Sequence, residues 1–133
     1  MDMQNCKKLG YAKNVKHDGN IITAFIKIAD RKEKSADALP EEFHDSKLTL
    51  LYDSLRILLE ALALQKGFKI YNHECYAAFL KEVMNKSSLG DMFDGFRKVR
   101  NSINYYAKEL SKEESQQIIK QMKWFIKEIK LKI

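Results

Sequence analysis

The feature that most constrains this chain is a leucine-rich stretch between Pro40 and Gly67. Apolar side chains recur there at alternating steps of three and four residues, the repeat of one face of an α-helix. The first row is Leu48, Leu51, Leu55, Leu58 and Leu62, and the second is Leu50, Ile57 and Leu64. Two rows make an apolar arc too wide for a helix that is covered on one side only. We therefore expect a central helix, ended by Gly67 as a C-terminal glycine, with other helices packed around it.

Four more segments have helical periodicity. They lie at residues 20–39, 72–83, 89–103 and 111–133. Asn20 and Asn72 are suitable N-caps for the first two, and Ser111 with Glu114 forms a capping box at the start of the last. The first of these helices is expected to stop before Pro40.

These segments define the expected fold. The chain has 133 residues, enough for one domain with its own core. One proline and five glycines leave too few turns for an all-β fold. The sequence predicts an all-α protein, an antiparallel up-and-down helical bundle of four to five helices. The domain is expected to span residues 20–133, with a linker at residues 68–71. Residues 1–19, which precede it, are expected to form a loose arm or a short irregular helix.

The charge distribution favours an anionic partner without requiring one. The net charge is +6, and both ends of the chain are basic while residues 36–60 carry two basic and six acidic side chains. A basic face would attract a phosphate backbone, but lysines also serve simply to solvate helix surfaces. Charge alone leaves both interpretations open.

Several classes of protein are disfavoured. No apolar run reaches the roughly 20 residues of a membrane helix, and the N-terminus lacks the apolar core of a signal peptide. We expect a cytoplasmic protein that does not contact membranes. Cys6 and Cys75 suggest neither a disulfide framework nor a metal site, because no CxxC pair is present. Glycine-rich phosphate loops are also missing, so we expect no metal and no cofactor.

One edge of the predicted helix at residues 89–103 and just beyond is unusually polar. At about 100° per residue, five polar side chains line up beside its apolar stripe. They are Arg97, Arg100, Asn101, Asn104 and Tyr105. An arginine whose stem lies on the core presents forked donors that suit a phosphate. The alternative is that Arg100 pairs with an acidic residue of a neighbouring helix.

The segment Arg97–Tyr106, RKVRNSINYY, resembles the signature segment of HEPN domains. These are small helical-bundle proteins of prokaryotes, often encoded beside a minimal nucleotidyltransferase. The order of the predicted helices agrees over about residues 20–130. The resemblance implies RNA or nucleotide binding, a homodimer formed through this helix, and a role in a toxin–antitoxin-like pair with a nucleotidyltransferase partner.

The resemblance also implies catalytic residues, with one departure. HEPN ribonucleases carry an arginine, a polar residue after it, and a histidine four to six residues further on. Arg100 and Asn101 match the first two, but Tyr105, Tyr106 or Ala107 stands where the histidine belongs. Tyrosine, with a pKa of about 10, is a poor base at pH 7. The substitution therefore favours binding over cleavage.

Three hypotheses follow for this edge. The first is binding of an RNA or nucleotide phosphate, with Arg97, Arg100, Asn104, Tyr105 and Tyr106 as the binding residues. The second is a divergent metal-independent endoribonuclease, with Arg100, Asn101 and Tyr105 as catalytic residues or with a recruited histidine as base. His73 is the most favourable of the three histidines, because the bundle can bring it near this helix. The third is a dimeric interaction module without a ligand.

Overall fold

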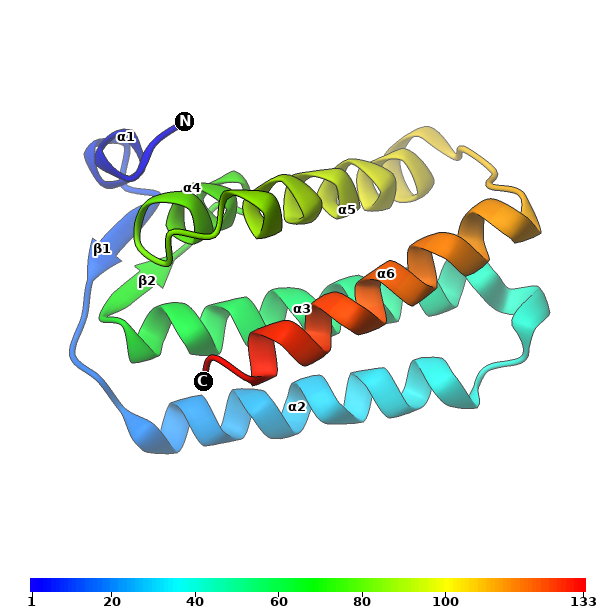
Figure 1. The fold of residues 1–133 in the computed structure, drawn as a ribbon, viewed down its shortest axis with the longest axis horizontal. Helices are drawn as coiled ribbons and strands as arrows, with labels where there is room; N and C mark the ends of the chain where they lie inside the picture. The colour runs from blue at the N-terminus through cyan, green and yellow to red at the C-terminus, as the bar shows by residue number, and fades with distance from the viewer.

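The computed structural model describes residues 1–133. Its elements, in chain order, are α1 (Met3–Lys8), β1 (Ala12–Asn14), α2 (Gly19–Ala38), the 3-10 helix η1 (Glu41–Phe43), α3 (His44–Gln65), β2 (Phe68–Ile70), α4 (Glu74–Glu82), α5 (Ser87–Tyr106) and α6 (Lys112–Lys130). The long helices α2, α3, α5 and α6 run lengthwise and alternate in direction (Figure 1). The predicted all-α antiparallel bundle is confirmed, with a two-stranded sheet added at one end.

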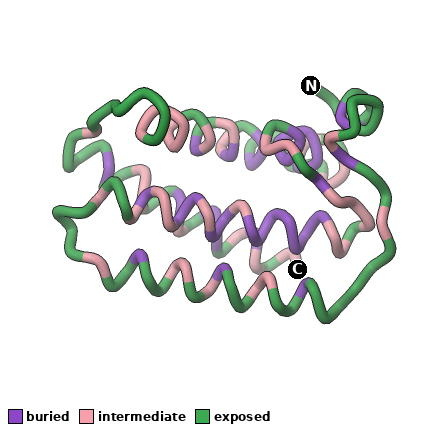
Figure 2. Tube along the Cα trace, turned by 180° about the vertical axis from the view of Figure 1, so that it is seen from behind, coloured by how far each residue is buried: buried purple, intermediate pink, exposed green.

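Helix α3 is the centre of the bundle, as its two apolar rows predict. The whole first row is buried, and in the second row Ile57 is buried while Leu50 and Leu64 are half-buried. Helices α2 and α6 make the most extensive contacts with α3, and α5 packs on it more lightly. Figure 2 shows buried residues along most of α3, whereas α2 is exposed along much of its length.

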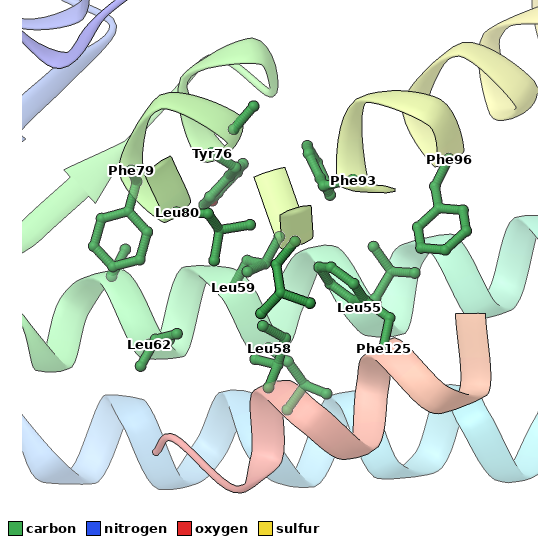
Figure 3. Close-up of a cluster of buried hydrophobic side chains, with 14 of the residues drawn as sticks. Leu55, Leu58, Leu59, Leu62, Tyr76, Phe79, Leu80, Phe93, Phe96 and Phe125 are labelled. Carbon is green, nitrogen blue, oxygen red and sulfur yellow. The ribbon is translucent and has the colours of Figure 1, made fainter. Parts of the chain in front are cut away.

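Aromatic rings attach α4 and α5 to this centre. Phe93 of α5 lies 5.9 Å from the ring of Tyr52 on α3 and 5.9 Å from that of Tyr76 on α4. Further along α5, Phe96 meets Phe125 of α6 edge to face at 5.6 Å. The leucines of α3 and these rings form one continuous cluster (Figure 3). This packing sets the position of α5, which carries the predicted polar edge.

Residues 1–19 include a short helix, one of the two alternatives predicted for this segment, and a strand that was not predicted. They form α1, whose N-cap Asp2 accepts a hydrogen bond from the backbone of Asn5, and β1, which pairs antiparallel with β2 so that Ala12 faces Ile70. The predicted linker at residues 68–71 is therefore largely a strand. Only Met3, Cys6 and Ala12 of this segment are buried, and three scattered residues are too few to produce a periodic pattern.

A disulfide between Cys6 and Cys75 corrects the prediction that these cysteines form no such bond. Their Cα atoms lie 6.1 Å apart, although the residues are 69 positions apart in sequence. The bond joins α1 to the first turn of α4, and both cysteines are completely buried. Two cysteines carry no spacing signal for pairing. Their proximity arises only when β1 pairs with β2 and places α1 against α4.

The expected helix ends are confirmed at Gly67 and Ser111 but not at Asn20 or Asn72, since the N-cap of α4 is His73. The capping box of Ser111 and Glu114 is confirmed at the start of α6, and Gly67 follows α3 with a φ of +92°, a conformation that favours glycine. Helix α2 starts one residue earlier than predicted. Its cap is Asp18, which accepts hydrogen bonds from the backbone of Asn20 and Ile21.

None of the helices combines the length and the apolar character needed to cross a membrane. No group of three or more histidine, cysteine, aspartate or glutamate side chains has the arrangement of a metal site.

We predict that the disulfide contributes about 2–4 kcal/mol to the free energy of unfolding, the usual range for a bond that closes a long loop. Urea unfolding of the oxidised protein and of protein treated with a dithiol reductant measures the difference. The C6S/C75S double variant should match the reduced protein and should not respond to reductant. Two free thiols in denatured, unreduced protein would contradict the prediction.

Candidate functional site

The predicted polar edge lies on the C-terminal half of α5, where the helix emerges from the core. Arg97, Arg100 and Asn101 are partly buried, while Asn104 is exposed. Tyr105 and Tyr106 are 67% and 79% exposed. Helix α5 ends at Tyr106, because Ala107 adopts the left-handed conformation with a φ of +51°. The edge thus grades from packed arginines to two aromatic rings in solvent.

Arg100 is held by aromatic rings and not by a carboxylate. Its guanidinium carbon lies 5.6 Å from the ring centre of Tyr52 and 5.5 Å from that of Tyr105, distances at which a cation is attracted to a ring face. Its Nη1 donates to the Tyr105 hydroxyl at 3.2 Å. Its Nε is buried and has no hydrogen-bond partner. The alternative in which Arg100 pairs with an acidic residue is therefore wrong.

Arg97 has a different environment, although it lies one turn earlier on the same helix. Its Nε is 3.4 Å from Asp94, and its Nη1 is 3.8 Å from Glu74 at the start of α4. Two carboxylates thus offset its charge. Arg97 ties α5 to α4, and of the two arginines on this edge only Arg100 is left without a counter-charge.

His73, just before α4, also contacts Tyr52, the ring on which Arg100 lies. The Tyr52 hydroxyl and the His73 Nδ1 are hydrogen-bonded at 2.9 Å, and the His73 ring also lies 6.3 Å from that of Tyr76. Tyr52 therefore contacts His73 with its hydroxyl and Arg100 with its ring face. The expectation that the bundle could bring His73 near the fourth predicted helix, α5, agrees with this arrangement.

Positive charge dominates the surroundings of this imidazole. Burial lowers the pKa of His73 from its ordinary value, and the guanidinium groups of Arg56, Arg100 and Arg97 lower it further, against a smaller opposite effect of Asp53. Burial also raises the pKa of Tyr52 to about 12. Near pH 7 the pair is therefore a neutral imidazole and a neutral phenol among three cations.

Arg56 is a site residue that sequence reasoning missed, together with Tyr52. Both lie on α3, four residues apart, on the side that faces α4 and α5. Arg56 pairs with Glu60 at 3.1 Å, and Glu60 also binds Lys69 of β2. A signal was present in the sequence, since a tyrosine and an arginine four residues apart lie among the leucine rows of this helix. The leucine rows concealed it.

Asn104 faces a separate shallow hollow between α3 and α5. The hollow has a volume of about 320 Å³ and is lined by Asp45, Ser46, Thr49, Leu50, Ile103 and Asn104. Arg100 is not among these residues, so the predicted edge divides into two parts. The part around Arg100 and Tyr105 is cationic and aromatic, and the part around Asn104 is neutral to acidic.

The His73 environment predicts how stability changes with pH. Because the pKa of His73 is lowered in the folded state, the unfolded chain takes up a proton near pH 6.5 before the folded protein does. This contribution to stability is therefore complete above about pH 6.5 and is lost as the pH falls below it. The free energy of unfolding should drop more between pH 7 and pH 5 in the wild type than in His73→Gln. Equal losses in urea titrations would contradict this.

Comparisons with known proteins add no family to this description. No family model matches the chain, and no match was found among curated proteins or solved structures. The HEPN resemblance therefore stays a prediction based on the segment Arg97–Tyr106. The candidate site is the cluster formed by Tyr52, His73 and Arg100.

Proposed function

We propose that this protein binds a phosphate group of RNA or of a nucleotide through Arg100 on α5. The observation that carries the proposal is the state of this guanidinium. It contacts two tyrosine rings and makes one hydrogen bond to a neutral hydroxyl, and no carboxylate pairs with it. A charged guanidinium without a counter-charge would gain from a phosphate that accepts hydrogen bonds from its terminal nitrogens.

The shape of the guanidinium suits a phosphate in particular. The two terminal nitrogens form a planar fork that can donate two parallel hydrogen bonds to an oxyanion. The ring of Tyr52, fixed by Phe93 and by the His73 hydrogen bond, holds the fork in place before any ligand arrives. Little conformational entropy would then be lost on binding.

Tyr105 and Tyr106 favour a nucleotide over inorganic phosphate. Both rings are largely in solvent, and that of Tyr105 contacts Arg100; an exposed aromatic ring offers a base a stacking surface. The hollow at Asn104 contains Asp45, whose charge disfavours a phosphate there. The proposal therefore places the phosphate at Arg100, a base on the tyrosines, and only neutral groups of the ligand near Asn104.

The biological setting is proposed from the HEPN resemblance alone. It comprises a homodimer through α5, a nucleotidyltransferase partner, and a toxin–antitoxin-like pair in the cytoplasm. The Cys6–Cys75 disulfide bears on the compartment, since cytosolic disulfides are usually reduced. Exchange requires a thiolate to reach a sulfur atom, and both cysteines are fully buried. The proposed location therefore requires burial to protect the bond.

Arg100→Ala tests the proposal. We expect it to weaken binding of a rhodamine-labelled oligouridylate of about ten nucleotides by roughly ten- to hundredfold at low salt, the usual value of a charged hydrogen bond to phosphate. Fluorescence anisotropy measures the affinity. Arg31→Ala is the matched control, because Arg31 is an exposed arginine on α2, away from the cluster. It should change affinity by less than about twofold.

The outcomes separate binding from folding and from assembly. Arg100 forms no ion pair, so the melting temperature of Arg100→Ala should stay within a few degrees of the wild type. Equal loss of binding in Arg100→Ala and Arg31→Ala would reduce the interaction to general electrostatics and refute the site. A variant that alters only the dimer equilibrium would support the interaction module instead.

The Tyr52–His73 hydrogen bond favours a second candidate, a metal-independent endoribonuclease. In the tautomer whose Nδ1–H donates to the Tyr52 hydroxyl, the Nε2 of a neutral His73 is unprotonated and available as a base. It would remove the proton of a ribose 2′-hydroxyl while the 2′-oxygen bonds to phosphorus. The 5′-oxygen would leave and take a proton from water. Arg100, with Asn101 and Tyr105, would hold the phosphate.

Cleavage of RNA in the presence of EDTA tests this second candidate. We expect single-stranded RNA to be cut by the wild type, with both Arg100→Ala and His73→Gln at least about a hundredfold slower, the middle of the range for general acid–base catalysis. Products should end in a cyclic phosphate. Absence of cleavage above the Arg100→Ala background would eliminate the enzyme and leave the binding proposal intact.

A further inference from the structure

His73 is surrounded by charged and titratable groups from three helices; burial and three guanidinium groups lower its pKa, against the opposite effect of Asp53. Helix α3 contributes Tyr52, Asp53 and Arg56, α5 contributes Arg97 and Arg100, and α4 contributes Tyr76 and the Glu74 carboxylate that pairs with Arg97. Glu74 and Asp94 already offset Arg97, and Glu60 offsets Arg56. Arg100, which contacts the Tyr52 ring, is the one arginine of the three whose charge no carboxylate offsets.

We infer that the Arg100 site takes up a proton at His73 when it binds a phosphate chain, so that its affinity rises as the medium becomes more acidic. This inference rests on the proposed function, since it concerns the same site and ligand. It adds a regulator, the proton, that neither the sequence motif nor the arginine alone implies.

The cause is electrostatic. In the free protein, the imidazole stays neutral because burial disfavours its charged form and because the guanidinium groups of Arg56, Arg100 and Arg97 oppose a further positive charge. A phosphate bound to Arg100 brings a negative charge into the same cluster. That charge offsets the guanidinium and attracts an imidazolium ion. The pKa of His73 should therefore be higher in the complex than in the free protein.

Tyr52 allows the proton to enter without loss of a hydrogen bond. Its phenol stays neutral because its pKa is raised to about 12, and a hydroxyl can either donate or accept. It can therefore donate to an unprotonated Nδ1 or accept from an Nδ1–H. The 2.9 Å contact survives in both protonation states, so the protonated state requires no rearrangement of the core.

Linkage fixes the sign and the upper limit of the effect. If a bound phosphate raises the pKa of His73, then a proton on His73 must strengthen phosphate binding by the same factor. Affinity should rise as the pH falls through the interval between the two pKa values and should level off below both. One titrating group changes the dissociation constant by at most about tenfold per pH unit.

The experiment measures the dissociation constant of the rhodamine-labelled oligouridylate between pH 5 and pH 8 at constant ionic strength. The probe should lack a terminal phosphate, because a phosphate monoester itself titrates near pH 6. The wild type should bind about threefold to tenfold more tightly at pH 5.5 than at pH 7.5, within the limit for one proton. His73→Gln, which retains a hydrogen-bonding side chain without the titration, should show no such change.

His17→Gln and His44→Gln are the matched controls. His17 lies in the segment before α2, and His44 lies at the start of α3 beside Asp45, so both variants should keep the pH dependence of the wild type. Proton uptake on binding, measured by calorimetry in two buffers of different ionisation enthalpy, should disappear in His73→Gln only.

The outcomes distinguish the two levels of the proposal. Binding that needs Arg100 but does not vary with pH, or that varies equally in His73→Gln, would overturn the inference and leave the proposed function standing. A pH dependence that persists in Arg100→Ala with unchanged affinity would place the ligand elsewhere and overturn both.

Discussion

The burial of α3 on most of its circumference is the constraint from which both the fold and the candidate site follow. A polar side chain on such a helix must find its partner inside the protein, because water is excluded. Ser54 donates to the carbonyl of Ala29 on α2, and Arg56 pairs with Glu60 on α3 itself. Tyr52, with no exposed surface, uses the imidazole of His73. The candidate site thus forms where a buried polar side chain of α3, Tyr52, contacts His73 before α4 and Arg100 of α5.

The three arginines around His73 differ in how far carboxylates offset their charges. Arg56 and Arg97 face carboxylates at 3.1–3.8 Å, so their charges are used within the protein. Arg100 has only aromatic faces and one hydroxyl. Cation–π contacts are weaker than a charged pair and leave the guanidinium edge open to an anion. The phosphate-binding role proposed for Arg100 depends on this difference.

Sequence reasoning succeeded where the information was local and periodic. The leucine rows and the capping box at Ser111 depend on residues within one helix, and both are confirmed. The polar edge of α5 is also local to one helix, but the structure divides it into a part around Arg100 and a part around Asn104. Sequence reasoning failed where partners are distant in sequence. The Cys6–Cys75 bond, the pairing of β1 with β2 and the Tyr52–His73 contact join segments that no helical repeat relates. Short strands of three residues also carry almost no periodic signal, so residues 12–14 and 68–70 were assigned to an arm and a linker.

The N-terminal segment connects these failures to the site. Cys75 lies two residues after His73, so the disulfide to α1 holds the first turn of α4. The backbone of Tyr71, two residues before His73, donates to the carbonyl of Tyr11 at 2.7 Å. Both flanks of the histidine are therefore attached to residues 1–19. Because the Tyr52–His73 hydrogen bond depends on where this turn lies, residues 1–19 help to position the imidazole. Any protonation or proton transfer at His73 consequently depends on α1 and β1 as much as on the arginines of α5.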